Sequence, residues 1–460
     1  MFNESRFTVI VGAGPTGLTL ARQLQRHGVP FRIIEKAPAL FEGSRGKGLQ
    51  PRTLEVLDDL GLIEDFLAAG GPYPPMLIHL PGGGTMERRM DEIKEPSASV
   101  PYPNMLMVPQ WRTGELLARG VPVEFGVGLD TLIQDDDGVH LRLDNGEKIT
   151  ARYVVGADGA RSTVRKALGV PFDGETQEDE QLFLADVKLT GLDRESWHVW
   201  PGPDGTSMRL ALCPLAGTDD FQLTSPDMDS SVEQLLAAAD PSVTVTHVGW
   251  TSRWRANVRL AQRFRVGNVF LAGDAAHVHP PTGGQGLNTG IQDAYNLGWK
   301  LATGDDAILD SYEAERLPVA AAVLGISTRL YQRLADRQQD AMRRDDPALQ
   351  QLALSYSAAD DRVEKGVLRA GDRAPDAPLA EGRIFDLLRG PHFTLLAVDW
   401  DGDLPDVGVP AHRVDEARDV YDGEGPRLYL IRPDNYIACV TSEPAEVATA
   451  AVRSGASGVR

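Results

Sequence analysis

The chain has 460 residues, and about 150 residues per domain predicts about three domains. Hydrophobic residues make up 42% and charged residues 24%, values typical of a folded globular protein rather than a disordered one. The formal net charge of −20 argues against nucleic acid or an anionic membrane surface as a partner, because Lys and Arg bind both. Cys213 and Cys439 form no CxxC and no zinc spacing, which predicts a reduced, cytoplasmic protein without a metal.

The apolar stretch at residues 7–21 predicts no export signal, because the leader MFNESR carries both an Arg and a Glu. It predicts a βαβ unit instead. Residues 7–11 are a buried strand, 18–28 a helix ending at Gly28, and 31–36 a second strand. No apolar run reaches 18 residues, so we expect no transmembrane helix.

The turn between the first strand and the helix reads Gly-Ala-Gly-Pro-Thr-Gly (12–17) and predicts a dinucleotide site. Gly12 allows a tight turn, Gly14 lets a pyrophosphate approach, and Gly17 lets the helix pack on the strand. Glu35, at the end of the second strand, is placed to bind a ribose. An acidic residue there favours an unphosphorylated adenosine ribose, as in FAD or NAD. A tight turn without a ligand is the structural alternative.

The middle of the chain predicts a loop and helix at 44–62, a Pro- and Gly-rich stretch at 72–108, and a short helix at 111–118. Strands follow at 121–126, 140–145 and 152–159. From 176 to 265, strand patterns alternate with loops and one helix (231–239), which predicts a largely antiparallel insertion. Strand patterns there and in the tail lie at 182–189, 209–215, 243–250, 393–400, 427–432 and 436–442.

A second glycine motif runs from Gly156 to Arg165 (GADGARSTVR). Taken by itself, this motif is also explained by a capped turn without a ligand, with Ser162 as the helix N-cap. The third motif, at 270–302, has a strand that leads to Gly273-Asp274, a Pro- and Gly-rich loop, and a helix that begins near Gly286. A helix N-terminus offers free N–H groups and partial positive charge, which suits an anion that develops on a bound ring.

His277 and His279 in the third motif raise the question of a metal site. Few carboxylates lie near them in the sequence, and the one-residue spacing is uncommon for metal ligands. We expect no metal, and a structural or supporting role for both histidines. A further long helix is expected from about Asp310 to Asp340, and the polar stretch 356–382 is expected to be a domain boundary.

The three motifs, in this order and at these separations, resemble those of the class A flavoprotein monooxygenases, the para-hydroxybenzoate hydroxylase family. The resemblance covers residues 7–345. The tail from Gly371 resembles the thioredoxin-like C-terminal domain of the phenol and polyketide hydroxylases, without a CxxC. The implied fold is α/β. A Rossmann-like FAD-binding domain occupies 1–71, 105–175 and 266–365; a mostly antiparallel substrate-binding domain occupies 72–104 and 176–265; and a small thioredoxin-like domain occupies 370–460.

The resemblance also implies roles for individual residues. Those expected to bind FAD are Gly12, Gly14, Pro15, Thr16, Gly17, Glu35, Lys36, Arg45, Gln110, Asp158, Asp274, Pro281, Gly284, Gly286, Leu287 and Asn288. Arg45 would contact the pyrophosphate, Gln110 the ribityl chain, and Asp274 the ribityl or pyrophosphate region. Asp158 belongs to the motif that the family uses for both FAD and NAD(P)H. Residues Pro281 and Gly284 to Asn288 would line the isoalloxazine. The segment after Gln110 is short, which predicts a trimmed surface helix.

The implied activity is hydroxylation of a bulky aromatic or polyketide-type substrate through a flavin C4a-hydroperoxide, with NAD(P)H as reductant. Such chemistry requires no general base, and no catalytic residue is assigned. Two alternatives keep the FAD motifs: a natural-product cyclase in which FAD is structural, and an antibiotic-inactivating or Baeyer–Villiger monooxygenase. The substrate pocket would lie between the flavin and the inserted sheet, with Trp197, His198, Trp200, Arg209 and Phe221 as candidate lining residues. Expected partners are a small molecule and, at most, a second copy of the chain.

Overall fold

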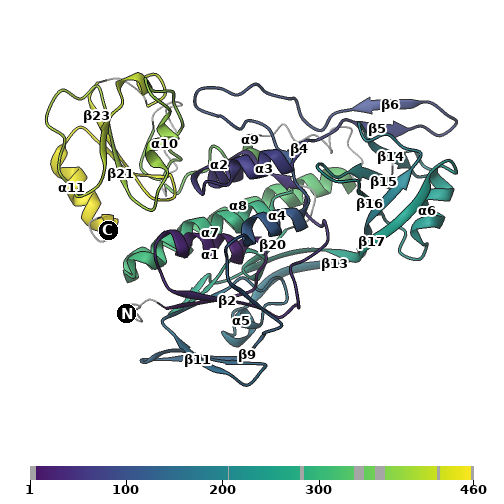
Figure 1. Ribbon diagram of the computed structural model, residues 1–460, viewed down its shortest axis with the longest axis horizontal. Helices are drawn as coiled ribbons and strands as arrows, with labels where there is room; N and C mark the ends of the chain where they lie inside the picture. Colours follow the sequence, from purple (N-terminus) through teal and green to yellow (C-terminus); the bar gives the residue numbers. More distant parts are fainter. Residues whose placement is uncertain are drawn as a thin grey trace.

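The computed structural model describes residues 7–205, 207–279, 284–335, 347–357, 368–421 and 425–456. Three structural units follow one another along the long axis of the molecule (Figure 1). The C-terminal unit and the largest sheet lie at opposite ends, and a sheet-and-helix unit that contains the N-terminal βαβ lies between them. Within the described residues, no helix is long and apolar enough to cross a membrane.

The central unit is built on a six-stranded sheet in the order β18-β19-β12-β1-β2-β8. The strands are β1 (Thr8–Val11), β2 (Phe31–Glu35), β8 (Val123–Phe125), β12 (Tyr153–Gly156), β18 (Arg265–Val266) and β19 (Val269–Leu271). All neighbours pair in parallel except the edge strand β18. The short β-branched runs at 8–11 and 153–156 are fully buried, as expected for parallel strands covered on both faces.

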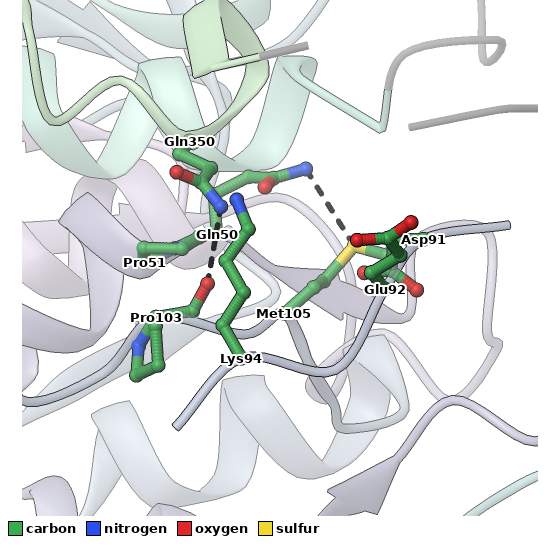
Figure 2. Close-up of a pocket in the computed structure, with 8 residues that line it drawn as sticks. All are labelled: Gln50, Pro51, Asp91, Glu92, Lys94, Pro103, Met105 and Gln350. Atoms are coloured by element: carbon green, nitrogen blue, oxygen red, sulfur yellow. Dashed lines mark hydrogen bonds between the residues drawn. The ribbon is translucent and has the colours of Figure 1, made fainter. Parts of the chain in front are cut away.

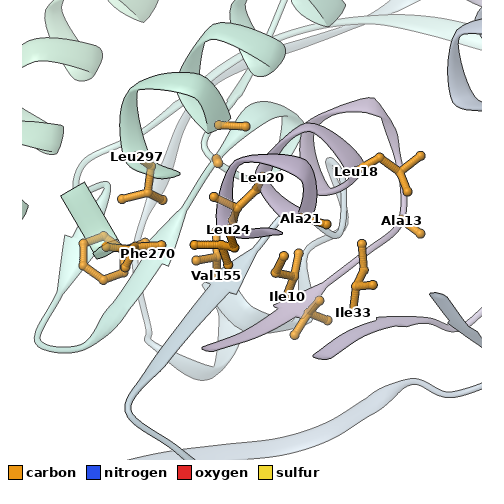
Figure 3. Packing of buried hydrophobic residues seen from close by; sticks show 14 of the residues in the cluster. Ile10, Ala13, Leu18, Leu20, Ala21, Leu24, Ile33, Val155, Phe270 and Leu297 are labelled. Carbon is orange, nitrogen blue, oxygen red and sulfur yellow. The ribbon is translucent and has the colours of Figure 1, made fainter. Parts of the chain in front are cut away.

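Helices surround this sheet or pack on the helices that cover it. They are α1 (Pro15–Arg26), α2 (Pro51–Asp59), α3 (Ile63–Ala69), α4 (Gln110–Ala118), α5 (Thr163–Ala167), α7 (Gly286–Thr303), α8 (Asp306–Ala335) and α9 (Pro347–Gln350). Figure 3 shows Leu20 and Leu24 of α1 packed among Ile10, Val155 and Leu297. This apolar core fixes α1 and α7 against the sheet, and it therefore fixes the two helix N-termini that the glycine motifs open.

A three-stranded hairpin sheet extends from the central unit, formed by β9 (Leu129–Asp135), β10 (Gly138–Leu143) and β11 (Lys148–Ala151). A second small sheet joins β3 (Gly48–Leu49), β7 (Leu106–Met107) and β4 (Gly71–Pro72). The sequence predicted no strand at 129–135. The helix expected to reach residue 62 ends at Asp59 instead, because Gly61, with φ of +70°, breaks it before α3.

The largest sheet has eight strands in the order β20-β17-β13-β16-β15-β14-β5-β6. They are β5 (Met76–His79), β6 (Thr85–Arg88), β13 (Phe172–Thr190), β14 (Trp197–Pro201), β15 (Met208–Pro214), β16 (Phe221–Ser225), β17 (Thr244–Ala261) and β20 (His277–Val278), with α6 (Val232–Ala239) on one face. Only β14 and β5 pair in parallel. The sheet is therefore mostly antiparallel, and the strands from 76–79 and 85–88 join those from 172–261.

The C-terminal unit has a four-stranded mixed sheet, β22 (Ala411–Arg413), β21 (Thr394–Val398), β23 (Arg427–Ile431) and β24 (Ile437–Thr441). Helices α10 (Ile384–Leu388) and α11 (Pro444–Arg453) accompany it. Buried charges join this unit to the central one. Glu55 of α2 is fully buried and accepts hydrogen bonds from Arg52 at 2.8 Å and from Arg373 at 2.8 Å. Although burial raises it, the two arginines hold the pKa of Glu55 below its usual value.

Candidate functional site

The turn after β1 leads into helix α1 without a side-chain cap. Gly14 is the N-cap of α1 and has no side chain to cap it, and Pro15 occupies the first turn. Pro15 lacks an N–H, so the free donors of this helix start belong to the residues that follow it. A Cβ added to Gly14 would meet no atom within 4 Å. The space in front of the helix is thus open to an anion, as the sequence predicts.

Gly12 and Gly17 permit the close packing that places this turn. Gly12 has φ of +108°, and a Cβ there would lie 2.4 Å from the carbonyl oxygen of Ala157. A Cβ on Gly17 would lie 2.0 Å from the carbonyl oxygen of Gly12. The predicted tight turn and the predicted helix–strand contact are both present, because a side chain at either position would collide with backbone.

Glu35 lies beside this turn. Its carboxylate accepts hydrogen bonds from the backbone N–H of Ala13 and of Ala37, both at 2.9 Å. These bonds hold the carboxylate next to the glycine motif, where it is placed to accept a further bond from a ribose hydroxyl. Lys36 follows it and is exposed. Both residues are on the side of the turn where the sequence places an adenosine.

The third motif meets the first at Thr16. The Thr16 hydroxyl oxygen lies only 2.4 Å from the place where a Cβ on Gly273, or one on Gly290, would stand. Glycine at these two positions therefore lets the turn before Asp274 and the helix α7 approach the start of α1. Segments separated by more than 250 residues in the sequence form one wall of a common site.

Asp274 occupies the short 3-10 turn Gly273–Ala275 (η2) and has an accessible side chain. The protein nevertheless surrounds its carboxyl group densely, and this burial raises its pKa, while His277 and Arg45 oppose the rise. A carboxylate that faces solvent from inside a recess suits hydrogen bonding to hydroxyl groups. Arg45 adds a positive charge near it. Its contact with a pyrophosphate stays a prediction.

Helix α7 begins at Gly286, as predicted, and its N-cap Gln285 makes no capping bond with its side chain. Asn288 is fully buried, donates to the carbonyl oxygens of Gly48 and Gly284, and accepts from the N–H of Gln50 at 2.8 Å. Gly284 has φ of +60°, a conformation that favours glycine. Pro281, also predicted to bind the cofactor, lies outside the described residues.

The loop at 44–48 lies against the starts of both α4 and α7. The N–H of Gly46 donates to Oε1 of Gln110 at 2.9 Å. A Cβ on Gly46 would lie 3.5 Å from Cδ1 of Leu287. Helix α4 is short, with nine residues, as expected from the trimmed segment. The structure thus brings Gln110, Gly46 and Leu287 together. Arg45 directly precedes Gly46 in the chain.

Asp158 has a structural role in the second motif. One carboxylate oxygen accepts from the hydroxyl of Ser162 at 2.5 Å, and the other from the N–H of Thr163 at 2.6 Å. The Ser162 side chain in turn accepts from the N–H of Arg165, which confirms Ser162 as the N-cap of α5. A cofactor role for Asp158 stays a prediction, because these bonds by themselves explain an acid at this position.

The sequence did not predict one buried network next to the site. Nε2 of His277 lies 2.6 Å from Asp293, whose other oxygen accepts from Nε of Arg316 at 2.7 Å. Nδ1 of His277 lies 2.9 Å from Nε2 of His279. Although burial raises it, His277 and Arg316 lower the pKa of Asp293 to about 2. The sequence could have indicated that Asp293 is buried, because it is an acid in the middle of a helix whose apolar residues recur with helical spacing. Nothing in the sequence around Arg316 indicated that it is the partner of Asp293.

The two histidines therefore bond to each other and to a carboxylate that an arginine already holds. Among the described residues, no group of three or more His, Cys, Asp or Glu could hold a metal ion. Burial, followed by the neighbouring His277, lowers the pKa of His279 well below its usual value. A neutral His279 beside α7 is consistent with the supporting role expected from the sequence.

A small pocket opens beside Gln50, close to the start of α7. Gln50, Met105, Lys94 and Gln350 line it, together with Pro51, Asp91, Glu92 and Pro103. Figure 2 shows the amide of Gln350 bonded to the carbonyl oxygen of Pro103, and that of Gln50 directed at the sulfur of Met105. Because Gln50 also bonds to Asn288, the pocket adjoins the start of α7.

FAD fits the residues of this site. Two helix starts without side-chain caps offer N–H donors for phosphates and for an electron-rich ring. Asp274 and Glu35 offer acceptors for hydroxyl groups at separate places, and the space in front of Gly14 is open. These donors and acceptors match a ligand with a diphosphate, a ribose and a second polyhydroxyl chain.

Comparison with known proteins identifies the ligand class. The model of the FAD binding domain family matches residues 7–327. The chain belongs to the FAD binding domain family. FAD is therefore its cofactor, and its relatives in this family include flavin-dependent monooxygenases. A flavin-dependent monooxygenase of Mycobacteroides abscessus is 45% identical, with 94% of this chain and 96% of that protein covered.

Two further proteins resemble this chain over nearly its full length. The rifampicin monooxygenase of Streptomyces venezuelae is 37% identical over 96% of this chain and 97% of its own length. The structure of an aklavinone-11 hydroxylase in complex with FAD and aklavinone superposes with a TM-score of 0.80. It is 26% identical and covers 99% of both chains. The likeness to these two proteins therefore extends over the C-terminal unit as well.

Proposed function

We propose that this protein is an FAD-dependent monooxygenase that hydroxylates a bulky aromatic or polyketide-type substrate, with NAD(P)H as reductant. One observation carries the proposal: the uncapped starts of α1 and α7 and the accessible Asp274 meet around Thr16. This arrangement can hold a flavin dinucleotide in an extended form. The flavin-dependent monooxygenases among the relatives then favour oxygen transfer as the reaction.

In this proposal, the turn at 12–17 binds the pyrophosphate with backbone N–H groups, and Glu35 binds the adenosine ribose. Arg45 adds a positive charge at the phosphates, and Gln110 and Asp274 bind the ribityl chain. Residues 284–288 lie along the isoalloxazine, where the start of α7 stabilises negative charge on the reduced ring. When bound, FAD supplies the activation of molecular oxygen and the atom that is transferred.

The protein contributes positioning and the exclusion of water. The face of the eight-stranded sheet that looks toward the loop at 44–48 supplies the opposite wall of the substrate site. Trp197 is on that face, because Lys47 of the loop lies over its ring. Trp200 and Phe221 belong instead to the apolar core on the other face, so we assign them to packing.

NAD(P)H has no second Rossmann motif in the sequence to bind it, since the one fingerprint is assigned to FAD. We therefore propose that the nicotinamide docks transiently at the surface of the flavin site. This docking needs no dedicated domain.

The test uses purified protein loaded with FAD. NADH or NADPH is added without oxygen, with and without aklavinone or rifampicin, and flavin bleaching is followed. Admission of oxygen should then give a product heavier by one oxygen atom. Bleaching that never occurs with either nucleotide and either compound would contradict the proposal, as would a protein that cannot bind FAD.

The relative named rifampicin monooxygenase, at 37% identity over nearly the full chain, favours a second candidate: inactivation of an antibiotic. The same experiment separates the two functions. Oxygenation of rifampicin with loss of its antibacterial activity supports inactivation, whereas oxygenation of aklavinone alone supports a biosynthetic type of hydroxylation.

A further inference from the structure

A row of polar side chains crosses the eight-stranded sheet on the face toward the loop at 44–48. Asp186 of β13 pairs directly with Gln222 of β16, and Gln222 with Cys213 of β15. Directly paired residues share a face of a sheet. We call Asp186, Gln222 and Cys213 the polar row. Their neighbours in sequence point to the opposite face and form an apolar core with α6.

The polar row is in contact with the loop that adjoins the FAD site. Nε2 of Gln222 donates to the carbonyl oxygen of Ser44, and Nζ of Lys47 donates to Oε1 of Gln222. Nζ of Lys47 also lies 4.6 Å from the centroid of the Trp197 ring. Lys47 is half-buried, so its ammonium group is fixed above the sheet and still has donor capacity for a ligand.

Asp186 is the unexplained member of the row. It is 6% exposed, and among the described residues neither of its carboxylate oxygens has a hydrogen bond of normal geometry. The side chain and the backbone N–H of Ser44 lie close enough to lower its pKa, yet the Ser44 hydroxyl likewise makes no hydrogen bond of normal geometry to any described residue. A buried carboxylate that is bonded only weakly is costly, and proteins retain such groups at functional sites.

The surroundings set the proton affinity of Asp186. Burial is the largest cause and raises the pKa of Asp186, Asp220 adds to the rise, and Ser44 and Lys47 oppose it, so that the pKa is about 6. At neutral pH the carboxylate is ionised but close to the range in which it takes up a proton. This range suits a general base.

We propose that Asp186 and Lys47 form the subsite for an acidic hydroxyl group of the substrate, a phenol or an enol. The hydroxyl oxygen lies between them, Asp186 accepts its proton, and Lys47 donates a hydrogen bond to the resulting oxyanion. The ligand reaches Asp186 by displacing the Ser44 hydroxyl, whose contact with the carboxylate does not have the geometry of a full hydrogen bond. The inference rests on the proposed function, because it places the substrate between the loop and the sheet.

The proton transfer has a chemical consequence. One O–H bond of the phenol breaks, one O–H bond forms on Asp186, and the electron pair stays on the phenol oxygen. The phenolate donates this pair into the ring, which makes the ring carbons ortho and para to the oxygen more nucleophilic. Asp186 would then promote the attack of the ring on the activated oxygen.

The experiment compares Asp186→Asn, Lys47→Met and the control Asp219→Asn, all loaded with FAD. Asp219 is an exposed acid near the end of the same strands, so it matches the charge change without touching the subsite. Each protein is titrated with aklavinone, which carries phenolic hydroxyls, and with its phenol methyl ether. Binding is measured by calorimetry, and the ionisation of bound aklavinone by its absorbance.

We expect wild-type protein and the control to bind aklavinone with the absorbance of the phenolate. Asp186→Asn and Lys47→Met should each lose at least about tenfold in affinity and should lose the phenolate signal. The methyl ether should bind all four proteins equally. Wild-type affinity and a phenolate spectrum in Asp186→Asn would overturn the proposal.

Stability shows whether Asp186→Asn is folded. The pKa of Asp186 is raised in the folded state, so its ionisation disfavours folding as pH rises from 3.8 through about 6. The variant should therefore melt at a higher temperature than wild type at pH above 6 and lose this advantage in acid. A lower melting temperature at neutral pH would count against a ligand-binding carboxylate held at a cost in stability.

Failure of the proposed function gives a different result. If wild-type protein binds FAD but neither bleaches nor oxygenates with either compound, the monooxygenase proposal fails. If wild type oxygenates aklavinone and Asp186→Asn does so equally well at every pH, only the subsite proposal fails. Wild-type protein that binds neither aklavinone nor rifampicin overturns both.

Discussion

The substitution Gly17→Ala tests the packing that forms the cofactor turn. A Cβ on Gly17 would lie 2.0 Å from the carbonyl oxygen of Gly12, whereas real Cβ atoms are not found closer than 3.0 Å. The start of α1 must therefore move by about 1 Å. Buried residues of α1, such as Leu18, Leu20 and Leu24, would move with it.

The expected loss follows from two opposing effects. Overpacking of this kind costs up to about 3 kcal/mol, and alanine in a helix gains about 1 kcal/mol over glycine. The net loss is about 2 kcal/mol. We also expect FAD affinity to fall at least about tenfold, since a binding site tolerates displacements of only about 0.5 Å.

Gly114→Ala is the matched control, because Gly114 lies within α4 and a Cβ there would meet no atom within 4 Å. It should gain up to about 1 kcal/mol from helix propensity and leave FAD binding unchanged. Urea unfolding followed by circular dichroism measures stability, and quenching of flavin fluorescence measures affinity. A Gly17→Ala protein with wild-type stability and wild-type FAD affinity would refute the packing argument.

Three further predictions follow from the charged groups. Asp274→Ala should weaken FAD binding about tenfold or more, because it removes an acceptor from the proposed ribityl site; unchanged flavin retention on a desalting column would argue against this role. Glu55→Ala should cost about 3–5 kcal/mol in a chemical denaturation experiment, since it leaves two buried arginines unpaired, whereas Glu147→Ala, which breaks an exposed pair, should leave the midpoint almost unchanged. The pKa of Asp293 is lowered from 3.8 to about 2, so its ionised carboxylate stabilises the folded protein above pH 3.8, and this contribution is lost as the pH falls toward 2. The unfolding free energies of wild type and Asp293→Asn should therefore converge over this pH range. Plots of the two free energies against pH that stay parallel would exclude the ion pair as the cause.

The cofactor turn was predictable because its geometry is local. The collision of a side chain at Gly12 or Gly17 with backbone depends mainly on neighbouring residues and on one parallel strand, and the βαβ pattern specifies both. The start of α7 at Gly286 was predictable for the same reason. The site at Ser162 followed from a capping pattern of a few residues.

The long strands of the large sheet were only partly predictable. The sequence suggested separate short strands, whereas β13 and β17 run for 19 and 18 residues. Their pairing shifts register three times, between Thr176 and Gln181, Ala185 and Val187, and Lys188 and Leu189. Each shift interrupts the alternation of apolar and polar residues, so the sequence pattern with period two stops at a point where the strand itself continues.

The sequence by itself determined the class of cofactor and the order of the segments proposed to hold it, because glycines and helix starts act over a few residues. Tertiary structure alone decided which charged groups became partners. Asp293 and Arg316 are 23 residues apart, and the loop carrying Lys47 reaches Gln222 across 175 residues. The type of a charged or amide residue shows only which kinds of group it can bind. Burial, and the strand that lies opposite, decide what it does bind and which groups, such as Asp186, have only weak contacts in the folded protein.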